Sequence, residues 1–221
     1  MSEYFCNERV MTPPSTAGWI EITLNDEAYD RVETYIKKSQ EKPHSIKGGL
    51  AGNLSYSHSL EDEDDWFFNN VLQYCIKQYM DSFPPLREVT YHLHRNPIGD
   101  VSSEHFELSS FWVNYQQKHE FNPIHDHSGI FSFVLWNNIP YKYVDEISQE
   151  FLGGCSRPEP GCFKFTYLSP LGELENYHYC HEDDMNKKLV FFPSRLRHSV
   201  NPFYSTDEVR VSVSGNLDFK K

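Results

Sequence analysis

Apolar and polar positions follow two different rhythms along the chain. Near the start, Trp19 to Leu24 alternates like a short strand, and Asn25 then offers an N-cap for a helix over Ala28 to Ser39. A second helix is predicted from about Asp64 to Ser82, with acidic residues at its beginning. Between the two helices, Lys47 to Leu60 is rich in Gly and Ser, which indicates a loop or a weak strand.

The rest of the chain changes to strand-like runs. The last run is the clearest, because valines alternate in it with Arg210, Ser212 and Ser214. Its apolar face suits packing under helices, and its polar face suits a site inside a barrel. Helices followed by strands predict an α+β fold with the N-terminal helices packed on one sheet. The predicted strands are Tyr91 to His94, Leu108 to Gln116, Ile130 to Asn138, Cys162 to Leu168, Lys188 to Phe192 and Val209 to Leu217.

The length of 221 residues suits one domain. We predict a single domain over residues 1–221, with helical support over about 1–88 and the strand core over about 89–221. The stretch from Tyr141 to Asp184 breaks the strand rhythm and is rich in Gly, Pro, Tyr and acidic residues. It predicts an insertion near 141–184 that either covers a substrate or is a surface elaboration without a role.

Two histidines separated by one residue form the clearest candidate site. On a strand, His125 and His127 point to one face, roughly 6 to 7 Å apart, and can aim at a single point. A third imidazole from His198 would complete a three-histidine face on a metal and leave the opposite positions open. Asp126 points away on a regular strand, and replaces His127 as a ligand only if a bulge rotates the backbone. No glycine lies between Asn122 and His127 to ease such a bulge, which favours His127.

A candidate anion clamp follows the third histidine. Turn residues from Asn201 to Asp207 separate His198 from Arg210, so we predict a hairpin that brings Arg210 and Ser212 close to His198. A guanidinium presents a fork that matches a carboxylate, and a neighbouring hydroxyl adds a donor. Two further residues, Asn114 and Tyr115, are predicted to line the same pocket, with a place in the core as the alternative for either one.

These motifs resemble those of the 2-oxoglutarate/Fe(II)-dependent oxygenases of the double-stranded β-helix (jelly-roll) superfamily, and more narrowly a branch common in marine phages and bacteria. The resemblance runs from Phe111 to Asn216 and departs from the larger superfamily at one place. The usual second ligand is Asp or Glu two residues after the first His, where this chain has His127. The motifs read, in order, Trp112-Val-Asn114, His125-Asp-His127, Phe192-Pro-Ser-Arg-Leu-Arg-His198 and Arg210-Val-Ser-Val-Ser-Gly-Asn216.

The resemblance implies a jelly-roll core, Fe(II) as the metal, 2-oxoglutarate held at its far carboxylate by Arg210 and Ser212, and O₂ as co-substrate. The implied activity is the oxidation, as a hydroxylase, of an organic substrate that the sequence does not name. One alternative is a cupin-like dioxygenase that uses three histidines without 2-oxoglutarate, against which a clamp at Arg210 argues. Another is a non-catalytic metal-binding jelly-roll module. Whether the substrate is a small molecule or a protein stays open, as does the oligomeric state.

Composition and charge exclude some other classes. A formal net charge of −12 argues against nucleic-acid binding, which needs a basic surface. No apolar run approaches the length of a membrane span, and the N-terminus lacks a basic region followed by an apolar one, so we expect neither a membrane segment nor a signal peptide. Five cysteines at no ligand-like spacing predict reduced thiols and a cytoplasmic location.

Overall fold

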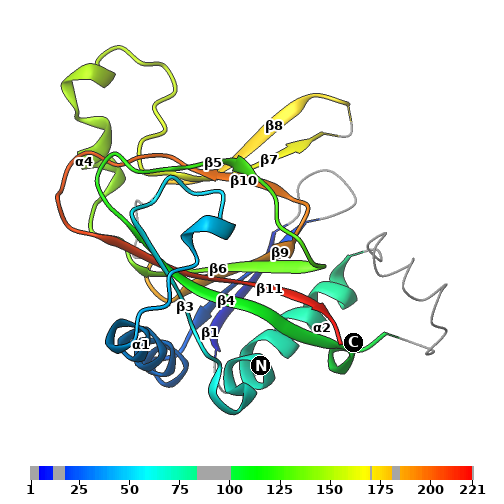
Figure 1. The fold of residues 1–221 in the computed structure, drawn as a ribbon. Coiled ribbons are helices and arrows are strands. Elements are labelled where there is room, and N and C mark those ends of the chain that lie inside the picture. Colours follow the sequence, from blue (N-terminus) through cyan, green and yellow to red (C-terminus); the bar gives the residue numbers. More distant parts are fainter. Residues whose placement is uncertain (1–4, 12–17, 84–100, 170, 181–184, 221) are drawn as a thin grey trace.

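Two antiparallel sheets face each other in this computed structural model (Figure 1), which describes residues 5–11, 18–83, 101–169, 171–180 and 185–220. Among these residues, one sheet has seven strands in the order β1-β2-β9-β6-β11-β4-β3, and the other has four in the order β5-β10-β7-β8. Strands that follow each other in sequence, such as β4, β5 and β6, often lie in different sheets. This is the architecture of a jelly roll, and it confirms the predicted fold class.

The elements have the following bounds. The strands are β1 Phe5–Met11, β2 Trp19–Leu24, β3 Tyr56–Ser59, β4 Phe106–Gln116, β5 Asn122–His125, β6 Phe131–Asn138, β7 Phe163–Leu168, β8 Leu174–Tyr179, β9 Lys188–Pro193, β10 Arg197–Val200 and β11 Arg210–Phe219. The α-helices are α1 Asp26–Glu41, α2 Gln73–Ser82 and α4 Tyr143–Ile147; shorter turns are η1 Lys47–Gly49, η2 Glu63–Asp65, η3 Phe68–Leu72, η4 Ser103–His105 and η5 Glu150–Leu152.

The two N-terminal helices pack on the outer face of the seven-stranded sheet. The first begins where the Asn25 side chain accepts a hydrogen bond from the backbone N–H of Ala28, at 2.9 Å. Its apolar stripe, including Val32 and Ile36, joins one buried cluster with residues of α2 and with the outward-facing residues of the central strands. None of the helices among the described residues is long and apolar enough to cross a membrane.

A second buried cluster lies between the two sheets. The central strands β6 and β9 supply side chains to both clusters, because successive residues of a strand point to opposite faces. Phe191 thus packs under the helices, whereas Phe192 packs between the sheets. Continuous apolar runs in these two strands follow from this burial on both faces. The inner cluster fills only part of the space between the sheets, and polar side chains line the remainder.

The structure corrects several sequence predictions. The second helix does not run unbroken from Asp64. The Asp62 carboxylate caps the N–H groups of Phe67 and Phe68, and a π-helical turn precedes α2. The strands β1, β8 and β10 had not been predicted, and the run from Tyr91 to His94 lies outside the described residues. Only part of the stretch 141–184 lies outside the sheets, since β7 and β8 belong to the four-stranded sheet.

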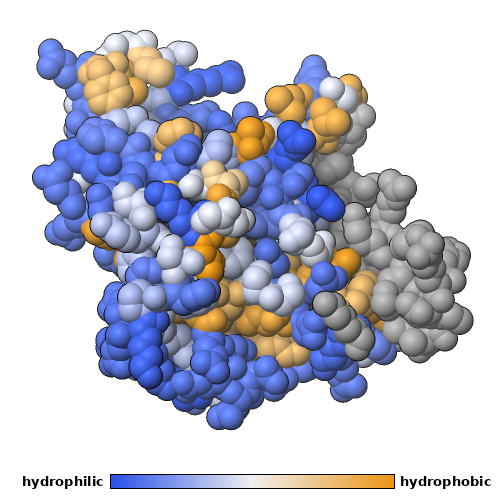
Figure 2. All heavy atoms as spheres, in the orientation of Figure 1, coloured by the Kyte–Doolittle hydropathy of each residue, from blue (hydrophilic) through white to orange (hydrophobic). Residues whose placement is uncertain are grey.

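Two segments project from the side of the four-stranded sheet and carry exposed apolar side chains. One contains α4 and η5, and the other is the turn between β7 and β8 (Figure 1). Figure 2 shows apolar atoms gathered on both projections. The exposed side chains are Val144, Ile147 and Phe151 on the first segment, and Leu168, Leu171 and Leu174 on the second.

One glycine is required at the turn that leads from β5 into β6. Gly129 has a φ of +86°, and a Cβ there would lie 2.7 Å from the backbone oxygen of Leu217. Gly154 has a similar φ of +81° but open space around it. We therefore expect Gly129→Ala to destabilise the fold by more than Gly154→Ala, for which the left-handed conformation alone costs roughly 1 to 2 kcal/mol. Chemical denaturation of the two variants measures both values, and equal losses would contradict the steric role of Gly129.

Candidate functional site

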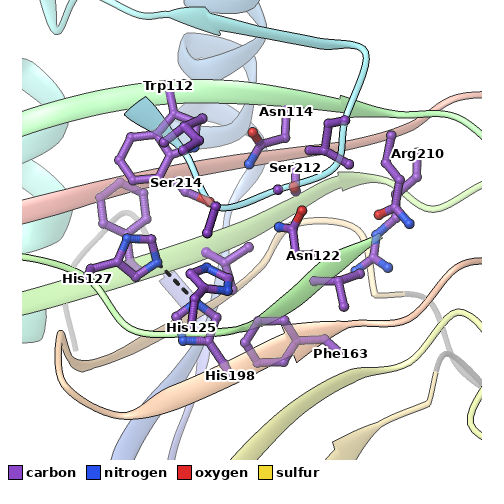
Figure 3. Close-up of a pocket in the computed structure, with 18 of the residues that line it drawn as sticks. Trp112, Asn114, Asn122, His125, His127, Phe163, His198, Arg210, Ser212 and Ser214 are labelled. Carbon is purple, nitrogen blue, oxygen red and sulfur yellow. Dashed lines mark hydrogen bonds between the residues drawn. The ribbon is translucent and has the colours of Figure 1, made fainter. Parts of the chain in front are cut away.

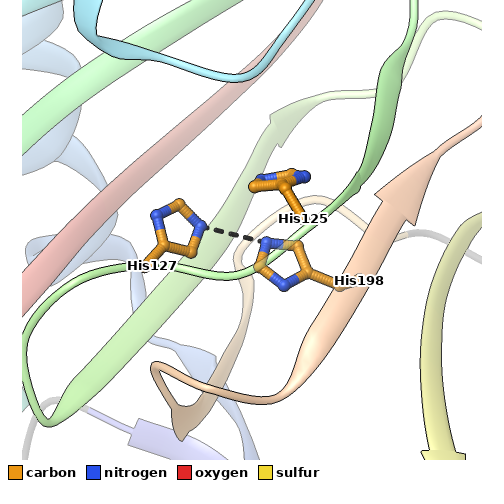
Figure 4. Close-up of side chains that lie close together, drawn as sticks. All are labelled: His125, His127 and His198. Atoms are coloured by element: carbon orange, nitrogen blue, oxygen red, sulfur yellow. Dashed lines mark hydrogen bonds between the residues drawn. The ribbon is translucent and has the colours of Figure 1, made fainter.

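Two of the three predicted histidines lie directly opposite each other on neighbouring strands. His125 ends β5 and His198 is the second residue of β10, and the two are partners in the antiparallel register. Their ring centroids are 4.3 Å apart. Both rings point into the space between the sheets (Figure 4).

Hydrogen bonds to backbone carbonyls fix the orientation of both rings. Nδ1 of His125 lies 2.7 Å from the carbonyl oxygen of Pro123, and Nδ1 of His198 lies 2.9 Å from that of Leu196. A carbonyl oxygen only accepts, so each Nδ1 carries the proton and each Nε2 keeps its lone pair. This pattern presents Nε2 as a metal ligand, in the way that carbonyl-bound histidines do in metal sites.

The third histidine lies just beyond the end of β5. The backbone N–H of His127 donates to the carbonyl of Ser194, at 2.8 Å, which ties this residue to the turn before β10. Its Nε2 lies 3.0 Å from Nε2 of His198 (Figure 4). Two nitrogens bound at a right angle to one ion, each about 2.1 Å from it, would be about 3.0 Å apart. The spacing of the two rings therefore fits a shared metal ion, which would take the place of the proton between them.

Burial keeps the three imidazoles neutral. It lowers the pKa of His127 to about 4, with a further contribution from His125, and lowers the pKa of His198 well below its usual value. Burial also lowers the pKa of His125. A neutral imidazole is the form that binds a metal. Among the described residues, these three form the one group of potential ligands that lie within 4.8 Å of one another.

Asp126 lies outside this group. Its carboxylate faces Arg195 at 3.8 Å on the surface, with about a third of the side chain exposed. Successive residues point to opposite sides, so the inward direction of His125 and His127 turns Asp126 outward. The geometry therefore does not support Asp126 as a replacement for His127.

Arg210 is buried and lacks an acidic partner among the described residues. Only 2% of its surface is exposed. Its Nη1 donates to the Tyr141 hydroxyl at 2.9 Å and to the Gly161 carbonyl at 3.1 Å. No described carboxylate lies within ion-pair distance of the guanidinium. Since an uncompensated buried charge is costly, this arrangement is suited to an anionic ligand.

Arg210 lines the same pocket as the histidines, but from the opposite sheet (Figure 3). The predicted hairpin between the strands of His198 and Arg210 is wrong, because β10 belongs to the four-stranded sheet and β11 to the seven-stranded sheet. The chain crosses between the sheets, so the two side chains approach each other across the barrel. The polar face predicted for the last strand does face the pocket, with Ser212 and Ser214 beside Arg210.

The two predicted neighbours on β4 differ in position. Asn114 lies opposite Ser212 in the register and lines the pocket. Its Oδ1 accepts a hydrogen bond from the Ser57 hydroxyl at 2.8 Å, which leaves its Nδ2 as the available donor. Tyr115 does not belong to the pocket, and that prediction is wrong. As the next residue of the strand it points to the other face, where its hydroxyl accepts a hydrogen bond from Gln40.

Sequence reasoning missed three residues of the site. Tyr141 and Gly161 hold the Arg210 guanidinium, and the Tyr141 hydroxyl also donates to the Gly161 carbonyl at 2.7 Å. Burial raises the pKa of Tyr141 to about 12, so its hydroxyl stays protonated. Asn122 lines the pocket between the histidines and Arg210 (Figure 3). The sequence signal that could have pointed to Asn122 is the neighbouring Pro123. Proline inside a strand marks an edge or a bulge, and a bulge changes the direction of the adjacent side chains.

Ser194 and Asn216, which belong to the last two sequence motifs, have a structural role. The Ser132 hydroxyl lies 2.9 Å from that of Ser194 and donates to Oδ1 of Asn216 at 2.8 Å. All three side chains are buried. The network joins β6, β11 and the turn whose backbone holds His127, so it stabilises the position of the third imidazole.

Comparisons with known proteins find a family match over the part of the chain that contains these residues. Residues 110–216, which contain the three histidines and Arg210, match the model of a family described as "Putative 2OG-Fe(II) oxygenase". This segment of the chain, 110–216, is thus similar to the 2-oxoglutarate/Fe(II)-dependent oxygenases. The cofactors of this oxygenase are accordingly Fe(II) and 2-oxoglutarate, with O₂ as co-substrate. The narrower assignment to a phage and marine-bacterial branch stays a prediction.

A solved structure with a TM-score above 0.5 shows the same fold. The non-haem α-ketoglutarate-dependent carbocyclase SnoK from nogalamycin biosynthesis has a TM-score of 0.54 and 9% identity, over 91% of this oxygenase and 79% of that chain. A prolyl-4-hydroxylase from Pseudomonas putida has a TM-score of 0.48 and 13% identity, over 93% and 95% of the two chains. The search of curated proteins found no match.

The middle ligand can be tested by metal content. We expect Asp126→Ala to retain roughly one divalent ion per chain, because Asp126 faces the surface, and His127→Ala to lose most of it. His127→Asp should retain iron, because it restores two histidines and one carboxylate. Elemental analysis of the purified variants measures this, and it identifies the bound ion, since three imidazoles also suit Ni²⁺ and Zn²⁺. Metal retention in His127→Ala together with loss in Asp126→Ala would show that the ligands are misassigned.

Proposed function

We propose that this oxygenase hydroxylates an organic substrate, with His125, His127 and His198 as its iron ligands and Arg210 as the anchor of 2-oxoglutarate. The observation that supports it best is the pairing of two features in one pocket. Three neutral imidazoles converge within 4.8 Å of one another, and a buried guanidinium without an acidic partner lies across the barrel from them. A ligand with a chelating end and a carboxylate end matches both.

The bound Fe(II) and 2-oxoglutarate supply the oxidation of a C–H bond by O₂, with release of succinate and CO₂. The chain itself supplies geometry, charge and exclusion of water. His125 and His198 are held by carbonyls, so both lone pairs face inward before a metal arrives. Aromatic side chains from both sheets, Trp112, Phe163 and Phe192, line the pocket next to the imidazoles and keep bulk water from them.

The proposed carboxylate anchor has a defined geometry. Tyr141 and Gly161 use one edge of the Arg210 guanidinium, at Nη1. The remaining donors, on Nη2 and Nε, are available for a carboxylate, and the Ser212 hydroxyl lies on the same face of β11. This anchor favours the proposal over a three-histidine dioxygenase that does not use 2-oxoglutarate.

We also propose a cytoplasmic location and no nucleic-acid partner. The odd number of cysteines supports the first, and the net charge of −12 supports the second.

The activity is tested by the turnover of 2-oxoglutarate in iron-reconstituted protein. We expect succinate to form as O₂ is consumed, in equal amounts, because decarboxylation of 2-oxoglutarate accompanies each oxidation. Nuclear magnetic resonance follows succinate, and an oxygen electrode follows O₂, with His198→Ala as the control that lacks a metal ligand. Consumption of O₂ without succinate would favour the dioxygenase that does not use 2-oxoglutarate, and neither signal across a broad substrate panel would favour a non-catalytic module.

The anchor is tested by affinity. Replacing Arg210 with Lys should weaken 2-oxoglutarate binding by roughly 1.5 to 3 kcal/mol, because an ammonium cannot reproduce the fork of donors. Arg197→Lys is the matched control, since Arg197 is exposed on the outer side of the four-stranded sheet. Anaerobic titration calorimetry compares the three proteins. An unchanged affinity in Arg210→Lys would place the anchor elsewhere.

A further inference from the structure

The strand that carries His125 has one residue more than its partner. His125 pairs with His198, but Asn122 pairs with Val200, so three steps on β5 match two steps on β10. Pro123 lies in this irregular part and has no N–H to give to a ladder. On a regular strand, Asn122 and His125 would point to opposite faces. The bulge turns both side chains into the pocket.

The Asn122 amide is left with an unmet hydrogen bond. Its Oδ1 is buried and has no partner among the described residues. The loop before β3 covers it closely, since a Cβ on Gly52 would lie 2.3 Å from that oxygen. A buried polar atom without a partner destabilises a fold, so a bulge that creates one points to a ligand.

The position of Asn122 indicates which ligand. Figure 3 shows its amide inside the pocket, between the histidine cluster and Arg210. A 2-oxo dicarboxylate that reaches from the metal to Arg210 passes this point. The oxygens of that dianion only accept hydrogen bonds, so they require the Nδ2 end of the amide. Nδ2 is the more accessible end of the amide, because Oδ1 is enclosed beneath the loop that contains Gly52.

We propose that Asn122 is a further binding residue for 2-oxoglutarate, to which it donates a hydrogen bond from Nδ2 on the side of the four-stranded sheet. Arg210 and Ser212 hold the same ligand from the seven-stranded sheet. This inference rests on the proposed function, because it assigns a second wall to the same co-substrate site. This binding role explains both the bulge and the unpartnered amide.

The test is anaerobic titration calorimetry of 2-oxoglutarate into Ni²⁺-loaded protein. Asn122→Ala should lower the affinity about three- to tenfold, the effect of one hydrogen bond. Asn122→Asp should lower it further, because its carboxylate repels the dianion. Asn176→Asp is the matched control: it adds the same charge on the outer face of the sheet, and its carboxylate still accepts from the Thr166 hydroxyl. We expect its affinity to stay within twofold of the parent protein.

A stability measurement separates this role from a structural one. Without ligand, Asn122→Ala should unfold at the same temperature as the parent protein or slightly higher, because it removes an unpartnered polar group. A lower unfolding temperature together with lost metal would assign Asn122 to the fold and overturn the inference. An affinity of Asn122→Ala within twofold of the parent protein would overturn it too. Absence of binding by the parent protein would instead overturn the proposed function.

Discussion

The antiparallel pairing of β5 with β10 is the constraint on which the site depends. It places His125 directly opposite His198, and the turns at the strand ends supply the carbonyls that orient both rings. His127 needs the same pairing, because its N–H bonds to the turn that leads into β10. A shift of one residue in this register would turn one imidazole to the outer face, so the ladder itself sets the relative positions of the imidazoles.

Sequence reasoning identified the residues of the site better than their arrangement. The spacing of His125 and His127 and the polar face around Arg210 were sufficient to predict which side chains point into the pocket, because strand periodicity depends only on neighbouring residues. The hairpin between His198 and Arg210 was not predictable in this way. A turn-rich stretch fits a tight reversal and a crossing between sheets equally well, and only the packing of both sheets decides between them. Tyr141 was missed for a related reason, since its contact with Arg210 joins residues far apart in the chain.

The bulge in β5 illustrates a further limit. Because no glycine lies between Asn122 and His127, the sequence predicts a regular strand there. The irregularity is nevertheless present, between Asn122 and His125 rather than between His125 and His127. Proline at position 123 tolerates it, because an edge strand without the N–H at that point loses no ladder bond. His125 and His127 still point to the same side, as they would on a regular strand. The bulge therefore changes the direction of the Asn122 side chain alone.

Tyr141 and Gly161 begin and end the excursion that contains α4 and η5. They meet at the Arg210 guanidinium, where the Tyr141 hydroxyl donates to the Gly161 carbonyl. The ring also lies against the Gly161 backbone so closely that a Cβ there would be 2.5 Å from it. The excursion is thus closed at its root, and the buried Glu146 carboxylate holds it a second time by accepting hydrogen bonds from the backbone N–H groups of Tyr204 and Ser205. The exposed tip around Phe151, beyond both of these contacts, is therefore the part that can vary with the least effect on the position of Arg210.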